Sequence, residues 1–232
     1  MAHLQIEKTW TMEKIDRAWW ENQQPMANTD LQRAGGKVWE PGPPHGMHLH
    51  DDAMEIFYIA QGRCRMRVGK DEQVIERNTL VWAPESAPHA LGTEGDEPMF
   101  LFLIVTPNVH ANRGRGGPFT KEEMSHKLQT YDVEPGVEFP RHPLLKAEVR
   151  EWEPDTEVLM HQHEDGEQMW YFLKGEGRVG VGLLEGKVWS HRYVWVPQNA
   201  PHWLENTGDE PLMALHFRYP NPAANRRERG LT

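Results

Sequence analysis

The sequence predicts an all-β chain made of two similar domains in tandem. Three observations lead to this prediction. The chain repeats itself at a fixed spacing, its apolar segments are short and rich in β-branched and aromatic residues, and Gly, Pro or Asp bounds each of them. A length of 232 residues is compatible with two small domains, and 38% hydrophobic residues with ten Trp can fill their cores.

A shift of 113 residues places the first half of the chain on the second without a gap. Trp39 falls on Trp152, and the sequence Gly-Asp-Glu-Pro at 95–98 falls on the same four residues at 208–211. Because this register holds from one end of each copy to the other, both copies are expected to have the same fold.

Within each copy the apolar segments are typical of strands. Segment 64–68 alternates Cys64, Met66 and Val68 with arginines, so its apolar side chains should face a core and its arginines solvent. The strands expected in the first copy cover residues 54–60, 64–68, 79–82 and 99–105.

Two segments have a helical pattern and should precede the domains as short lead-ins. They cover residues 11–21 and 120–129, and the second begins with a capping box formed by Thr120 and Glu123. Pro and Gly over residues 107–118 indicate a linker. The expected organisation is a lead-in over 1–35, a domain over 36–106, a linker with a short helix over 107–146, a second domain over 147–219 and a polar tail over 220–232.

The composition disfavours several classes of partner. The 25 basic residues against 35 acidic ones leave a formal charge of −10, which would repel a nucleic-acid backbone or an anionic membrane surface. The single cysteine, Cys64, cannot form an internal disulfide or a thiolate zinc site. Because the sequence also shows no signal peptide and no apolar run of membrane length, a cytoplasmic protein is expected.

Pairs of histidines two residues apart indicate a metal site in each copy. On a strand such residues point to the same face, about 6.6 Å apart, so both imidazoles can chelate one ion. Five residues after each pair stands a side chain with a carbonyl-type oxygen, and a third histidine follows 34 residues later. These residues are His48, His50, Glu55 and His89 in the first copy and His161, His163, Gln168 and His202 in the second.

The spacing of these residues resembles the two sequence motifs of the cupin family. In the first copy, the defined positions of the first motif are occupied by Gly42, His48, His50, Glu55 and Gly62, and those of the second by Pro84 and His89. In the second copy the matching residues are His161, His163 and Gly175 for the first motif and Pro197, His202 and Asn206 for the second.

Five positions depart from the family pattern. Thr93 replaces an Asn, Asp155 a Gly and Gln168 a Glu, while Ser86 and Asn199 stand where the second motif has an internal Gly. The resemblance nevertheless extends over about residues 36–106 and 147–219, which is most of the chain.

The resemblance implies two tandem jelly-roll β-barrels, each with a divalent transition metal held by three histidines and a carboxylate. Family members bind Fe, Mn, Ni, Cu or Zn, and the residues here do not select among these metals. The metal ligands that it implies are His48, His50, Glu55 and His89 in the first barrel and His161, His163, Gln168 and His202 in the second.

The first site is expected to bind metal more tightly than the second. Gln168 offers a neutral amide oxygen where Glu55 offers a carboxylate. The neighbouring Glu167 is a poor substitute, because adjacent residues of a strand point to opposite faces. Two further histidines leave alternatives open. His45 either reaches the rim of the first pocket or lies in an exposed loop, and His216 either lines the second pocket or serves packing.

The favoured function is that of an oxidoreductase of the dioxygenase type. A divalent ion with one carboxylate ligand keeps a net positive charge, which would attract a small anionic or enolizable substrate. A metal-assisted isomerase of a keto acid is the alternative enzyme, and a non-catalytic protein that binds a sugar or an acid is the alternative outside enzymes. The expected partner is a small-molecule substrate, and a homo-oligomer stays open.

Overall fold

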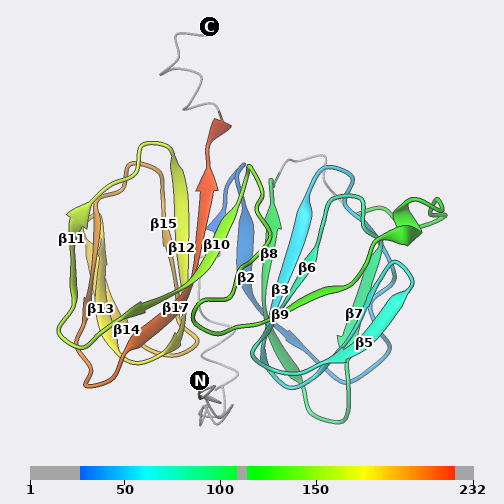
Figure 1. The fold of residues 1–232 in the computed structure, drawn as a ribbon, viewed down its shortest axis with the longest axis horizontal. Coiled ribbons are helices and arrows are strands. Elements are labelled where there is room, and N and C mark those ends of the chain that lie inside the picture. The colour runs from blue at the N-terminus through cyan, green and yellow to red at the C-terminus, as the bar shows by residue number, and fades with distance from the viewer. Residues whose placement is uncertain (1–26, 109–113, 223–232) are drawn as a thin grey trace, which may run out of the picture.

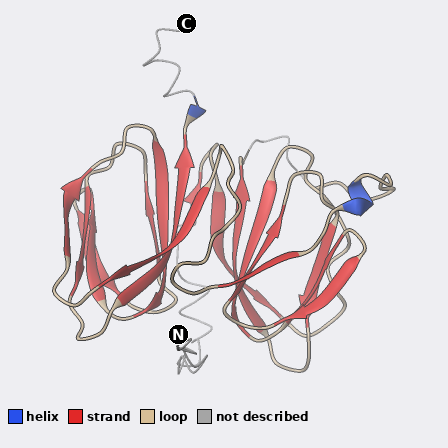
Figure 2. Cartoon of the chain, viewed as in Figure 1, coloured by secondary structure: helices blue, strands red, loops and turns tan. Residues whose placement is uncertain are grey.

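The computed structural model describes residues 27–108 and 114–222, and almost all of their regular structure is β-strand (Figure 2). The strands form two barrels that lie side by side, β1 to β9 in one and β10 to β17 in the other (Figure 1). The all-β prediction is therefore confirmed. In the described part of the chain, no helix is long and apolar enough to cross a membrane.

The first barrel has a larger and a smaller sheet. The strand order is β1-β2-β8-β3-β6-β9 in the larger sheet and β5-β4-β7 in the smaller. The strands are β1 (Ala27–Asn28), β2 (Arg33–Trp39), β3 (Met54–Gln61), β4 (Cys64–Val68), β5 (Asp71–Ile75), β6 (Thr79–Ala83), β7 (His89–Thr93), β8 (Met99–Thr106) and β9 (Gln129–Asp132).

The second barrel has two four-stranded sheets, with the orders β10-β17-β12-β15 and β11-β16-β13-β14. Its strands are β10 (Lys146–Trp152), β11 (Glu157–His161), β12 (Gly166–Lys174), β13 (Gly177–Val181), β14 (Leu184–Val188), β15 (Tyr193–Val196), β16 (His202–Asn206) and β17 (Leu212–Pro220). Strands β10, β13, β14 and β16 lie 113 residues after β2, β4, β5 and β7. The gapless repeat in the sequence is therefore a repeat in structure.

The helix expected over residues 120–129 is wrong, because only a 3-10 turn, η1 (Glu123–Ser125), forms there. The predicted capping box is present. The backbone N–H of Thr120 donates to Oε2 of Glu123 at 2.6 Å, and that of Glu123 donates to Oγ1 of Thr120 at 3.1 Å. The other helix, expected over residues 11–21, lies outside the described residues.

Tertiary packing explains why the turn does not continue as a helix. The backbone becomes extended at His126, Leu128 packs against the inner core of the first barrel, and β9 then pairs with β6. These contacts outweigh a helical propensity that is worth little per residue.

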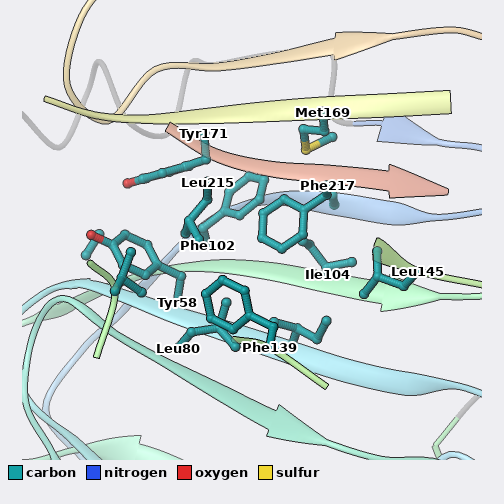
Figure 3. Packing of buried hydrophobic residues seen from close by; sticks show 14 of the residues in the cluster. Tyr58, Leu80, Phe102, Ile104, Phe139, Leu145, Met169, Tyr171, Leu215 and Phe217 are labelled. Carbon is teal, nitrogen blue, oxygen red and sulfur yellow. The ribbon is translucent and has the colours of Figure 1, made fainter. Parts of the chain in front are cut away.

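A large hydrophobic core lies between the two barrels. The sheet that contains β3 and β8 faces the sheet that contains β12 and β17, and their side chains interdigitate (Figure 3). Alternate residues of one strand serve different cores, since Phe57 packs inside the first barrel and Tyr58 between the barrels. Phe172 and Tyr171 do the same in the second barrel. Burial on both faces explains why these strands are apolar throughout.

A pseudo-twofold axis relates the barrels. Tyr58 and Tyr171 are equivalent in the repeat, and their rings contact each other with centroids 5.1 Å apart. A residue touches its own equivalent only close to a twofold axis. The hydroxyl partners are equivalent as well, because Tyr58 donates to Oδ1 of Asn78 at 3.0 Å and the hydroxyl of Tyr171 lies 3.0 Å from Nδ1 of His191.

Glu167 faces the inter-barrel side of its strand, as the alternation of side chains predicts. Its Oε2 accepts hydrogen bonds from Oγ1 of Thr29 at 3.0 Å, Nε2 of Gln32 at 3.1 Å and Nε1 of Trp195 at 3.0 Å. Glu167 thus links the first barrel to the second and contributes nothing to the histidine cluster.

The backbone accommodates most departures from the second cupin motif. Ser86 and Asn199, at the position of the motif's internal glycine, have φ angles of 58° and 64°. Thr93 makes the same hydrogen bond as the Asn of the motif. Its Oγ1 donates to the last carbonyl of β2 at 2.7 Å, and in the second barrel Nδ2 of Asn206 donates to the equivalent carbonyl, the last of β10, at 2.8 Å.

Candidate metal centres

The first centre brings together all four residues that the motifs predict. His48 forms an isolated antiparallel bridge with His89, the first residue of β7, and Glu55 lies near the start of β3. The ligand atoms of His48, His50, Glu55 and His89 all lie within 4.8 Å of one another. Only His48 is half-buried, and the other three side chains are buried.

Backbone carbonyls fix the orientation of four histidines. Nδ1 of His48 lies 3.1 Å, and Nδ1 of His89 lies 2.9 Å, from the carbonyl oxygen two residues earlier in the chain. His161 and His202 make the equivalent contacts at 2.8 Å. A carbonyl oxygen only accepts, so Nδ1 carries the proton and Nε2 presents a lone pair to the centre, as a metal ligand must.

Four acceptor groups converge at the first centre. Nε2 of His89, His50 and His48 lie 2.8, 3.1 and 3.8 Å from one oxygen, Oε2 of Glu55. Imidazole lone pairs and a carboxylate oxygen repel one another unless a proton or a cation lies between them. The donor set therefore fits a divalent transition metal, for which imidazole and carboxylate are ordinary ligands.

The acid–base state of the first centre suits metal binding. Burial raises the pKa of Glu55, but the hydrogen bonds and positive charge that His50 and His89 offer when a proton sits on Nε2 outweigh burial and hold the pKa at about 2. Burial lowers the pKa of His48, and the neighbouring His89 lowers it further. At neutral pH the carboxylate is therefore charged and His48 is neutral, which are the states that coordinate metal.

The second centre repeats the three histidines in a more open setting. His161, the last residue of β11, pairs with His202 of β16, and His163 follows two residues later. Their ligand atoms lie within 4.8 Å of one another. His161 is exposed and His163 is half-buried, so solvent reaches this centre more easily than the first.

Gln168 reaches the second centre with its amide nitrogen. Nε2 of Gln168 donates to Nε2 of His202 at 2.6 Å, while Oε1 of Gln168 lies 3.0 Å from Nε2 of His216. Nδ1 of His216 lies 2.8 Å from Oε1 of Glu148. The amide therefore satisfies the lone pair of His202, and the oxygen that was expected to bind metal points to His216.

A nearby cation makes the second centre differ further from the first. Nη2 of Arg218 lies 3.5 Å from Nδ1 of His163. Burial, followed by the charge of Arg218, lowers the pKa of His163 to about 4. The positive charge that disfavours protonation also disfavours a metal cation. Tighter metal binding at the first centre stays a prediction, and the charge of Arg218 is a further physical reason for it.

Sequence reasoning missed Glu148 and left two alternatives open for His216. A signal was present in the repeat, because the shift of 113 residues places these two polar residues on Gly35 and Leu103. A polar pair that replaces an apolar one in a single copy marks a local change of environment.

His45 lies in an exposed loop, which was one of its two predicted positions. Its ring contacts those of His48 and Trp39, with centroids 5.2 and 5.6 Å away. From this loop His45 packs against the ring of one residue of the first centre.

Comparison with protein families identifies the fold family. The family model described as the cupin domain matches this chain over two stretches, residues 38–105 and 148–218. The chain belongs to the cupin family. The two matches coincide with the two barrels, so this cupin is a bicupin.

Solved cupin structures share the two-barrel fold. Salicylate 1,2-dioxygenase from Pseudaminobacter salicylatoxidans is 15% identical with a TM-score of 0.65, covering 87% of this chain and 74% of its own. A cupin 2 conserved barrel domain protein from Leptotrichia buccalis is 12% identical with a TM-score of 0.62, covering 83% and 85%. Oxalate decarboxylase from Bacillus subtilis is 18% identical with a TM-score of 0.54, covering 82% and 69%. At these identities the likeness shows the fold.

A relative by sequence is an uncharacterized protein from Methanocaldococcus jannaschii. It is 31% identical over 65 residues, which are 28% of this chain and 52% of that protein. The match thus spans about half the length of the relative.

Proposed function

We propose that this bicupin is a metal-dependent oxidoreductase of the dioxygenase type that acts on a small anionic or enolizable metabolite at its first centre. The observation that carries the proposal is the convergence of three imidazole nitrogens and the Glu55 carboxylate in a largely buried cluster. Similar folds occur in a salicylate dioxygenase and an oxalate decarboxylase, whose named substrates are small carboxylic acids.

The residues of the first centre determine what it can bind. His48, His50, His89 and Glu55 would hold Fe, Mn, Ni, Cu or Zn, and the ion would supply a positive centre that binds and polarises a chelating anion. Glu55 cancels one of its two charges and leaves the centre attractive to acids and enolates. The ring of Phe57, 5.8 Å from that of His89, borders the cluster with an apolar surface. A small molecule is therefore the proposed partner, and a net charge of −10 argues against nucleic acid.

Metal analysis and oxygen consumption test this proposal. The purified protein should contain a transition metal and should consume dioxygen with at least one member of a panel of hydroxybenzoates, oxalate and 2-keto acids. His48→Ala should abolish oxygen consumption while the circular dichroism spectrum stays unchanged. His161→Ala should reduce consumption less, because the second centre has no carboxylate ligand.

Other outcomes would identify the alternatives. Product formation without oxygen uptake would indicate an isomerase or a decarboxylase, and a protein that takes up no metal would indicate a binding module. Oxygen consumption that survives His48→Ala but disappears with His161→Ala would assign the reaction to the second barrel.

A further inference from the structure

Residues 114–128, here called the wall segment, run along the edge of the first centre. Arg115 forms an antiparallel bridge with Leu49, with backbone N···O distances of 3.0 and 2.9 Å. Leu49 lies between His48 and His50 in the sequence. The wall segment therefore pairs with the stretch of backbone that carries two residues of the first centre, although its sequence is typical of a linker.

Gly114 passes close to these two ligands. A methyl group at Gly114 would overlap Cδ2 of His48 and would lie 3.3 Å from Cε1 of His50. Both carbons are bonded to Nε2, the ring atom that faces the centre. Such a close approach of the backbone requires glycine. By contrast, a methyl group at Gly116 would meet nothing within 4 Å.

An ion pair with Asp51 anchors the wall segment at the end next to Gly114, and a second ion pair lies within the segment. Nε of Arg115 lies 3.0 Å from Asp51, and the same guanidinium pairs with Glu123. Glu123 is in turn held by its capping box with Thr120. A linked set of charges fixes a backbone better than an isolated exposed pair does.

The other end of the wall segment is anchored to β5. Asp71 lies 3.2 Å from Nζ of Lys127, and its second carboxylate oxygen accepts from the backbone N–H of Leu128 at 3.4 Å. Leu128 packs against the inner core of the first barrel. The wall segment is thus fixed at both ends.

The second centre has no equivalent wall among residues 27–108 and 114–222. Strand β11, which carries His161, is an edge strand of its sheet. Leu184, the equivalent of Asp71, is 80% exposed, and the adjacent Leu183 is fully exposed. Within the described part of the chain, the wall segment therefore borders the first centre and has no counterpart at the second.

We propose that the wall segment restricts the first centre to small aliphatic chelating acids and excludes aromatic ones. This inference rests on the proposed metal at the first centre and narrows its substrate class. Gly114 determines the free space beside His48 and His50, and Arg115 positions Gly114.

The test uses full-length protein in which His161→Ala and His202→Ala leave only the first centre. Co²⁺ is the metal probe, and oxalate and 4-nitrocatechol are the small and the larger ligand, followed by visible absorption. Arg115→Ala should raise the affinity for 4-nitrocatechol relative to oxalate by about tenfold or more. Arg65→Ala is the matched control, because Arg65 is an exposed arginine paired with Glu94 on the outer face of β4, and it should leave the ratio unchanged.

A second pair of variants tests Gly114 directly. Gly114→Ala should weaken Co²⁺ binding by about tenfold or more, because the methyl group displaces His48, whereas Gly116→Ala should bind as the parent does. Equal behaviour of the two glycine variants, or an unchanged ligand ratio in Arg115→Ala, would overturn the inference. A parent protein that binds no Co²⁺ would instead contradict the proposed metal centre.

Discussion

At the scale of single residues, the two centres differ in one functional group. An oxygen of Glu55 faces three imidazole nitrogens in the first centre, and the amide nitrogen of Gln168 faces His202 in the second. The carboxylate needs a cation to offset its charge, whereas the amide donates a hydrogen bond that a metal would have to displace. The centres should therefore differ in affinity although their histidines are equivalent.

Exchange of these two side chains tests that difference. Glu55→Gln should weaken metal binding at the first centre by at least about tenfold, or 1.4 kcal/mol, since the anionic ligand is lost from a buried site. Gln168→Glu should strengthen binding at the second centre by a similar factor. Isothermal titration with Mn²⁺ or Co²⁺ measures both. Equal affinities in the parent protein, unaffected by either change, would mean that the histidines alone determine binding.

The sequence predicted which residues form the two centres but not how each side chain is oriented. The histidines and Glu55 follow from motif spacing because a barrel returns its strands to fixed positions. The orientation of Gln168 depends instead on His216 and Glu148, which come from β17 and β10 and bond to it only in the folded chain. The proximity of Gly114 to His48 and His50 likewise arises only from tertiary structure, since the sequence around Gly114 is typical of a linker.

At the scale of elements, strands were predicted better than the segments between them. Burial on one or both faces of a strand dictates the order of its apolar and polar residues, and this order can be read directly from the sequence. The capping box of Thr120 and Glu123 was read correctly, but the chain beyond it joins the first barrel as β9. Local signals predict where a turn begins, and packing decides how far it continues.

The turn before β15 should make folding of the second barrel sensitive to acid. Burial lowers the pKa of His191 to about 4, from 6.5 in an unfolded chain. As the pH falls from 6.5 to 4, the unfolded chain binds a proton at this histidine that the folded chain does not bind. The free energy of unfolding therefore decreases by up to about 3 kcal/mol. His191→Asn, which copies Asn78 of the first barrel, should remove this decrease and leave stability at pH 8 nearly unchanged.

Urea denaturation at pH 8 and pH 4.5 measures the effect of His191→Asn. The reciprocal variant, Asn78→His, should add a comparable acid sensitivity to the first barrel. If the parent and His191→Asn lose the same stability on acidification, another group is responsible for it.

At the scale of the whole molecule, the core between the barrels makes the repeat a single structural unit. Tyr58 and Tyr171 lie at its centre and are fully buried, and Phe102 contacts Tyr171 with ring centroids 4.8 Å apart. Glu167 adds hydrogen bonds from the first barrel at the margin. An apolar interface of this kind resembles the interior of a domain rather than a transient contact.

The barrels should therefore unfold together, in one calorimetric transition. Tyr171→Ala removes the central contact between them, should cost about 3–5 kcal/mol, and should split the transition into two as the barrels uncouple. Phe172→Ala is the matched control, because this adjacent residue packs inside the second barrel. It should lower the melting temperature without splitting the transition, since the inter-barrel core stays intact. Two transitions in the parent protein, or the same profile for both variants, would show that each barrel is stable on its own and that the shared core only holds them in place.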